Sequence, residues 1–230
     1  MLQGIFKAIG YGLCHQLPER SLFAGGLQLP VCARDTGIYL GFALGLVVVV
    51  LLDRGRRSRE LPRWPVLALM GLFVLSMAID GLTSYGGLRE TTNAIRLATG
   101  LATGWALAPL TVMMINEQLW AQGARTRIIE GARATALWIG GLLASFALAW
   151  TVLPLTGVLY PIVVSAAIIT TFMAVNLVFV GLLPRFEKRA KRFRDAVPQL
   201  AITLALTAGE LAAAAWLRAI AEGASRVTVG

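Results

Sequence analysis

The stretch TGIYLGFALGLVVVVLL, residues 36–52, decides the fold class, because it is almost entirely apolar and holds no charged residue. About 20 such residues cross the hydrocarbon core of a bilayer as a helix. The chain continues as DRGRRSRELPR, residues 53–63, with five arginines. An apolar run that ends in a short arginine-rich stretch is typical of a transmembrane helix that leaves the membrane at its cytoplasmic surface.

Further apolar runs of similar length follow along the chain. They cover residues 65–82, 93–115, 134–157, 159–183 and 199–220. The chain has 230 residues, of which 57% are hydrophobic and 14% charged, and this is more apolar surface than a soluble core can bury. The sequence therefore predicts an all-α, polytopic membrane helix bundle of about six transmembrane helices. We expect one integral membrane domain over residues 1–230, made of an outer-face N-terminal segment, 1–35, and a six-span bundle, 36–220.

Basic residues are concentrated in three of the connections between these runs. Residues 53–63, 117–133 and 184–198 hold five, three and six Lys or Arg, and they follow the first, third and fifth runs. Alternate loops lie on the same side, so the positive-inside rule places all three in the cytoplasm and both termini outside. We expect a multi-pass protein of the cell inner (plasma) membrane. The net charge of +9 is then explained by topology, and no nucleic-acid partner is expected.

Two short segments precede the first apolar run. Residues 1–13, MLQGIFKAIGYGL, are too short to span a bilayer, and residues 21–31, SLFAGGLQLPV, have a similar character. Both are typical of interfacial or re-entrant segments, which would lie at the outer face. A helix entered at Pro30 would then begin the first span.

Residues of the types that bind metals are concentrated just before the first span. Cys14 and His15 are adjacent, and Cys32 and Asp35 are three apart, a spacing that places two side chains on one face of a helix. Thiolate, imidazole and carboxylate are all ligands of zinc, so this set is a candidate zinc site. Two alternatives remain open. One is a disulfide between Cys14 and Cys32, which the oxidising outer compartment permits, and the other is two unlinked buried thiols.

A second polar segment, DGLTSYGGLRETTNAIRLATG, covers residues 80–100. If the third helix begins near Arg89, then Arg89, Asn93 and Arg96 share one stripe at about 100° per residue. Two guanidinium groups near a helix N-terminus form an anion site, suited to phosphate or carboxylate. Gly100, near the same stripe, leaves room for a ligand or a neighbouring helix. The alternative is that these arginines neutralise carboxylates and only hold the outer ends of the spans together.

The order of the spans predicts that polar residues from both segments meet in one recess at the outer face. The first span starts there, the second ends there and the third starts there. Charged groups at that depth pair with one another rather than face lipid. The residues expected to form this anion-binding or lipid-binding recess are Arg34, Asp35, Asp80, Arg89, Glu90, Asn93 and Arg96.

One carboxylate, Glu210, lies near the middle of the last apolar run. An unpaired carboxylate at that depth is energetically costly, so we expect a partner on another helix or a role in carrying protons. Arg218 is two helical turns away, which is too far for an easy contact.

Two sequence motifs resemble those of a known family. The run CHQLPERS, followed by LPVCARDTGIYLGF, falls within residues 14–42, and DGLTSYGGLRETTNAIRLATG covers residues 80–100. Both are similar to the signatures CHQ…PVCAR(C/D)TG and DG…RE(S/T)TN…R…TG of an uncharacterised family of small predicted integral membrane proteins, a domain of unknown function. In that family the position of Asp35 is often cysteine, which implies a metal or redox site in relatives. The resemblance implies no reaction, substrate or partner.

Three classes of function agree with these features. A site that binds or processes an anionic, phosphate-bearing membrane lipid would use four arginines at headgroup level, with carboxylates for acid–base work. These arginines are Arg20, Arg34, Arg89 and Arg96. A non-catalytic subunit of a larger complex, with partner membrane subunits, would need no catalytic motif. A small-solute or ion transporter would use six spans and Glu210. We expect lipid binding first, and whether the protein is an enzyme stays open.

Overall fold

The computed structural model describes residues 2–227, with side chains described as far as residue 223. Most of the chain is helical, and the η elements are single turns of tighter or wider helix. In chain order the elements are α1 (Leu2–Tyr11), η1 (Pro18–Arg20), β1 (Ser21–Ala24), β2 (Leu27–Cys32), α2 (Ala33–Asp53), α3 (Trp64–Tyr85), α4 (Asn93–Leu119), α5 (Gly131–Ala147), η2 (Leu148–Val152), η3 (Leu153–Thr156), α6 (Leu159–Gly181), η4 (Phe193–Ala196) and α7 (Val197–Val227).

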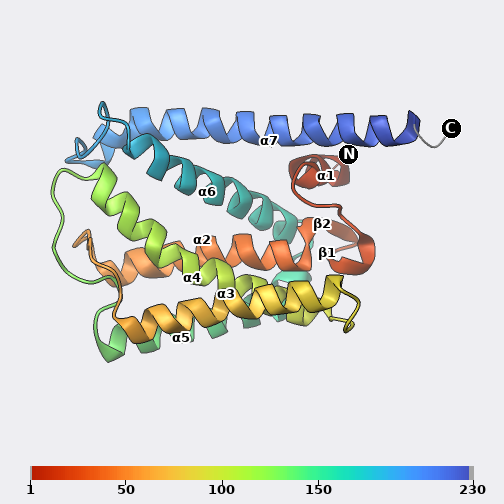
Figure 1. The fold of residues 1–230 in the computed structure, drawn as a ribbon, viewed down its shortest axis with the longest axis horizontal. Helices are drawn as coiled ribbons and strands as arrows, with labels where there is room; N and C mark the ends of the chain where they lie inside the picture. The colour runs from red at the N-terminus through yellow and green to blue at the C-terminus, as the bar shows by residue number, and fades with distance from the viewer. Residues whose placement is uncertain (1, 228–230) are drawn as a thin grey trace.

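Six helical segments within residues 2–227 are long and apolar enough to cross a membrane. They are the long helices drawn side by side in Figure 1, where α7 lies along one edge and α2 and α4 run through the middle. The fourth span combines α5 with η2 and η3, because Pro154 interrupts the regular helix near its end. The prediction of a six-span, all-α membrane bundle is confirmed, with boundaries a few residues from those expected.

α2 and α4 pack against each other through glycines on both helices. A Cβ atom added at Gly41 of α2 would lie 2.2 Å from a carbonyl oxygen of α4, and one at Gly104 of α4 would lie 2.0 Å from a carbonyl oxygen of α2. Gly37 and Gly100 make equivalent approaches one turn nearer the helix N-termini. Small residues four apart allow two backbones to come this close in a membrane. The room that Gly100 leaves is therefore filled by a neighbouring helix.

Residues 21–32 form an antiparallel hairpin, which the sequence did not lead us to expect. β1 and β2 pair with Ala24 opposite Leu27, and the turn between them places Gly25 and Gly26 at φ 55° and 77°. Glycine adopts such angles at little cost, so the adjacent glycines favour a hairpin over a helix. The predicted helix start at Pro30 is wrong, because Pro30 lies in β2 and α2 follows it.

The three basic loops lie together at one end of the bundle, on the left in Figure 1. Backbone hydrogen bonds join them to one another and to the end of α4. The N–H of Arg59 donates to the carbonyl of Ala124 at 3.2 Å, and the N–H of Lys188 donates to that of Gln118 at 2.7 Å. The prediction that these loops share one side of the membrane requires such an arrangement.

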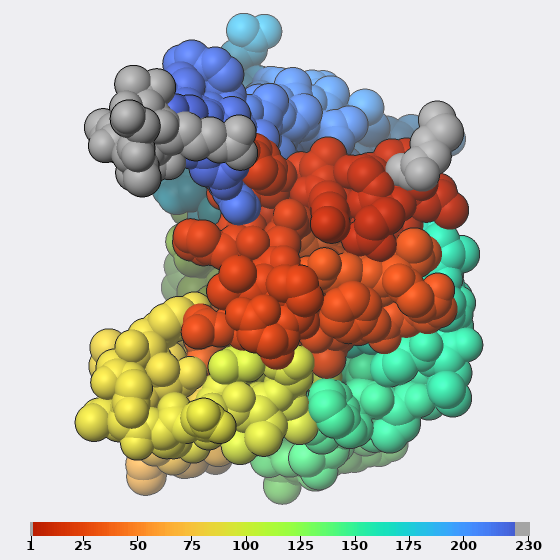
Figure 2. Space-filling model, turned by 90° about the vertical axis from the view of Figure 1, so that its right-hand side faces the viewer, coloured from red at the N-terminus to blue at the C-terminus, as the bar shows by residue number. Residues whose placement is uncertain are grey.

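The opposite end of the bundle is covered by the N-terminal segment. Figure 2 faces this end and shows the first segments of the chain, in red, spread across its middle. The loop after α3, in yellow, and the turn near residue 155, in turquoise, lie at its edges. β2 packs against α1 and α6, and Gly25 of the hairpin turn meets Gly157 closely. The segment is thus a folded cap over the ends of the spans.

Candidate functional site

Asp80, near the end of α3, is the centre of a buried ionic cluster at the capped end. Its side chain is 1% exposed and accepts hydrogen bonds from Arg34, Arg89 and the hydroxyl of Thr91. Arg34 is nearly buried, with 11% of its side chain exposed, and its guanidinium also lies 5.5 Å from the ring centre of Tyr85. Both carboxylate oxygens are satisfied, so this cluster holds α2, α3 and the α3–α4 loop together.

Arg89 lies before α4 and not on it. The helix begins at Asn93, with Thr92 as its N-cap, and the Thr92 hydroxyl accepts a hydrogen bond from the N–H of Ile95 at 3.3 Å. The prediction of a helix start near Arg89 is wrong, because Thr92 satisfies an otherwise free donor of the first turn. Arg89 therefore shares no helical stripe with Asn93 and Arg96.

Asn93 binds the N-terminal segment, and Arg96 binds Asn93. The side-chain amide of Asn93 donates to the carbonyls of Glu19 and Ser21, both at 3.2 Å. Arg96 donates to the Asn93 side-chain oxygen at 3.0 Å. Among residues 2–223, Glu90 is exposed and forms no ion pair. Six of the seven residues expected in one recess are thus divided between an ionic cluster, an attachment point for the hairpin, and a separate pocket that contains Asp35, and Glu90 belongs to none of these groups.

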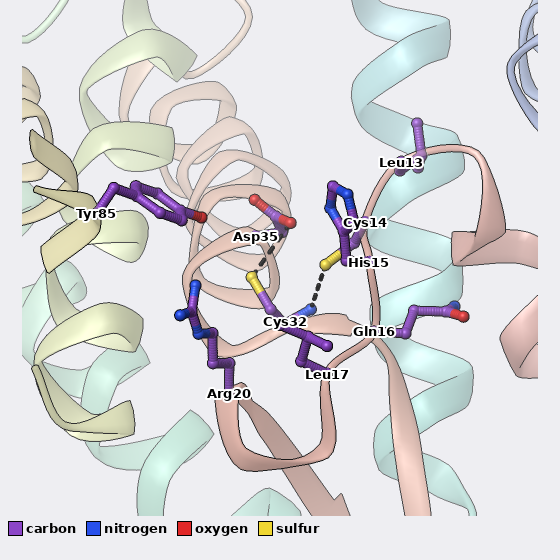
Figure 3. Close-up of a pocket in the computed structure, with 9 residues that line it drawn as sticks. All are labelled: Leu13, Cys14, His15, Gln16, Leu17, Arg20, Cys32, Asp35 and Tyr85. Carbon is purple, nitrogen blue, oxygen red and sulfur yellow. Dashed lines mark hydrogen bonds between the residues drawn. The ribbon is translucent and has the colours of Figure 1, made fainter. Parts of the chain in front are cut away.

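That pocket is a cavity of about 550 Å³ at the capped end, between the loop after α1 and the start of α2. Figure 3 shows polar and sulfur-containing side chains gathered around it, with the ring of Tyr85 on the far wall from the loop. Leu13 and Leu17 add apolar surface. The lining residues are Leu13, Cys14, His15, Gln16, Leu17, Arg20, Cys32, Asp35 and Tyr85.

Two thiols and one carboxylate face one another in this pocket. One donor atom each from Cys14, Cys32 and Asp35 lies within 4.8 Å of the other two, and Figure 3 shows the three side chains converging. The Cys32 thiol donates to a carboxylate oxygen of Asp35 at 3.2 Å, and the N–H of Cys32 donates to the sulfur of Cys14 at 3.3 Å. Both cysteines are free and partly buried.

The two thiols have different acidities. The pKa of Cys14 is lowered, mainly by hydrogen bonding with the side chain of Cys32. The same interaction raises the pKa of Cys32, and burial raises it further. The structure brings together three of the four residues proposed for metal binding. His15 lines the pocket but lies outside the group of converging donor atoms.

Arg20, one of the arginines expected at headgroup level, lines this pocket. Its guanidinium lies 5.5 Å from the ring centre of Tyr85. Within residues 2–223 its side chain forms no hydrogen bond or ion pair, in contrast to Arg34 and Arg89. Its place in the first motif was visible, but its position in the pocket depends on the hairpin that folds the segment back over α2.

The last helix is attached to the pocket wall through Arg218. Its guanidinium donates to the carbonyls of Tyr11 and Cys14, lies 4.4 Å from the ring centre of Tyr11 and pairs with Glu222 at 2.7 Å. Tyr11 in turn donates to Glu222 at 2.8 Å. These contacts fix the backbone of the loop that carries Cys14.

Glu210 accepts a hydrogen bond from Asn176 of α6 at 2.8 Å. Asn176 is buried and also donates to Thr207 at 3.2 Å. The expected partner on another helix is therefore an amide and not a cation. Glu210 itself lies on the exposed side of α7.

Together, the six candidate spans and the cap define a polytopic membrane protein. The chain belongs to a family described as predicted membrane protein (DUF2085), whose model matches residues 14–110. The matched part holds the hairpin, the ionic cluster and every pocket residue from Cys14 onward.

Two archaeal relatives are each similar to a little less than half of this chain. An uncharacterised protein of Methanocaldococcus jannaschii is 34% identical over 108 residues, which are 47% of this chain and 67% of that protein. An uncharacterised protein of Methanothermobacter thermautotrophicus is 38% identical over 102 residues, which are 44% of this chain and 86% of that protein. No solved structure matches the chain.

Proposed function

We propose that the capped-end pocket binds an anionic, phosphate-bearing lipid headgroup at the outer face of the membrane. The observation that carries this proposal is Arg20, whose guanidinium lines the pocket without a hydrogen bond or ion pair to any residue of the described part, 2–223. A guanidinium binds phosphate oxygens through paired, charge-assisted hydrogen bonds.

The surroundings of the pocket suit an amphiphilic ligand. Leu17 of the pocket lining, Phe23 of β1, and Leu2 and Ile5 of α1 expose large apolar side chains at this end. Such side chains are stable where lipid tails or headgroups meet them. The ligand's phosphate would then bind Arg20 while its apolar part stays at the membrane surface.

The test uses the purified protein in dodecyl maltoside and native mass spectrometry. Phosphatidic acid, phosphatidylcholine and inorganic phosphate are added separately. We expect phosphatidic acid to bind in preference to the other two. Arg20→Gln should weaken its binding about tenfold, equivalent to losing one charge-assisted hydrogen bond of roughly 1.5 kcal/mol.

Lys7→Gln is the matched control, because Lys7 is an exposed cation on α1 at the same end and does not line the pocket. It should leave the affinity within about twofold, as expected for a screened surface charge. Equal binding by the wild type and Arg20→Gln would refute a headgroup site at this pocket. Binding of inorganic phosphate with the same affinity would identify free phosphate as the ligand instead.

A second candidate, a subunit of a larger membrane complex, is favoured by α7. The span that contains this helix is only 11% buried, and Glu210 lies on its exposed side. A carboxylate inside the membrane favours polar protein surroundings over lipid. The same mass spectra, read for co-purifying chains, test this candidate.

A further inference from the structure

We propose that Cys14, Cys32 and Asp35 form a zinc site at the base of the pocket. The three donor atoms already lie within 4.8 Å of one another. Zinc bonds of about 2.3 Å to sulfur and about 2.0 to 2.2 Å to oxygen place neighbouring ligands somewhat closer than that. Small rotations of three partly buried side chains are enough to close the group around an ion.

The carboxylate of the group has no cationic side chain as a partner within residues 2–223. Asp35 accepts one hydrogen bond, from the Cys32 thiol, and within residues 2–223 it forms no ion pair. Asp80, at the same end of the bundle, is paired with two arginines. Groups that become anionic in a partly buried site are stable when paired or bound to a metal. A bound cation would supply this compensation.

The backbone around the donors is held in place before any metal binds. Arg218 binds the carbonyl of Cys14, and the N–H of Cys32 donates to the Cys14 sulfur at 3.3 Å. Cys32 is the N-cap of α2, and Asp35 lies in the first turn of that helix. Outer contacts of this kind orient ligands and raise metal affinity.

The mixture of donors selects the metal. Two sulfurs exclude magnesium and calcium as preferred ions, and zinc accepts both thiolate and carboxylate. Three protein ligands leave a fourth position, which opens into the pocket beside His15 and Arg20. Water, or an oxygen of the pocket's anionic ligand, would occupy it. Zinc binding does not require the proposed lipid binding.

The experiment measures metal content and spectra, and no activity assay is needed. Protein purified under a non-thiol reductant is dialysed against zinc, and elemental analysis should give roughly one zinc per chain. Replacing zinc with cobalt should produce the near-ultraviolet band of thiolate-to-cobalt charge transfer. Cys14→Ser with Cys32→Ser should abolish both signals. Asp35→Asn should weaken zinc binding by more than the roughly 10–100-fold that loss of an outer contact costs.

The matched control is Glu19→Gln, an exposed carboxylate in the same cap that does not line the pocket. It should keep one zinc and the cobalt band. Retention of the folded, membrane-extracted protein is checked for each variant by size-exclusion chromatography. The proposal is overturned if the wild type binds no zinc, or if the cysteine variants bind as much as the wild type. It is also overturned if protein isolated under non-reducing conditions carries a Cys14–Cys32 disulfide. None of these outcomes decides whether the pocket binds phosphatidic acid, because that proposal has its own measurement.

Discussion

The buried carboxylate of Asp80 is bound by two arginines and a threonine instead of by water. Asp80→Asn keeps the shape of the side chain but removes the charge, which leaves the nearly buried Arg34 without its counter-ion. Breaking one partner of a buried ion pair costs about 3–5 kcal/mol, and we expect a loss of this size in the free energy of unfolding. Denaturant titration in mixed micelles measures it.

The control for this prediction is Glu60→Gln, which removes a surface pair with Arg127 at 3.9 Å. Both side chains of that pair are about half exposed, so the change should cost less than about 1 kcal/mol. If Asp80→Asn costs no more than the control, the cluster does not hold the spans together, and its arginines become candidates for ligand binding.

The candidate site could be predicted from the sequence only in part. Cys14, Cys32 and Asp35 were selected because their chemistry and spacing are visible in the chain. Arg20 was expected only at headgroup level, because its position in the pocket depends on the hairpin. The structure pairs Asp80 with Arg34 and Arg89, while Asp35 faces the Cys32 thiol, and the sequence does not say which charge pairs with which.

At the scale of helices, the glycines between α2 and α4 set the position of the site, because α2 begins immediately after Cys32. Gly41→Ala would place a methyl group 2.2 Å from a carbonyl oxygen of α4, so the helices must separate. Overpacking of this kind costs about 1–3 kcal/mol. We expect that loss in the free energy of unfolding, together with weaker zinc binding, because the shift moves Asp35.

Gly140→Ala is the matched substitution on α5, where an added Cβ meets nothing within 4 Å. Its effect should be neutral or stabilising by up to about 1 kcal/mol, since alanine is the better helix former. Equal losses in the two variants would contradict close α2–α4 packing.

The spans themselves were predictable because each is a long apolar run, and the glycine spacing was visible too. The hairpin was not, because short apolar segments before a span resemble interfacial helices.

At the scale of the whole molecule, the last prediction concerns which end of the helix bundle faces the cytoplasm. The three basic loops lie at one end of the bundle, and the loop after α1 and the start of α2 lie at the other (Figure 1). Residues of that loop and of the start of α2 line the pocket. Arginine and lysine in short loops stay in the cytoplasm, so the pocket should face outward. We therefore expect single cysteines at Glu60, Gln122 and Glu187 to react with a membrane-permeant maleimide in intact cells. A sulfonated, impermeant maleimide should reach them only after permeabilisation.

Leu88→Cys, 80% exposed beside the pocket, is the outer-face control and should react with both reagents in intact cells. All four cysteines are placed in a chain whose Cys14 and Cys32 are serine, so that only the introduced thiol reports. None of the four substitutions removes a basic residue, which keeps the charge that determines orientation. Labelling of any one loop position by the impermeant reagent in intact cells would contradict the predicted orientation and indicate the opposite one. The pocket would then face the cytoplasm, where the reducing compartment keeps Cys14 and Cys32 as free thiols.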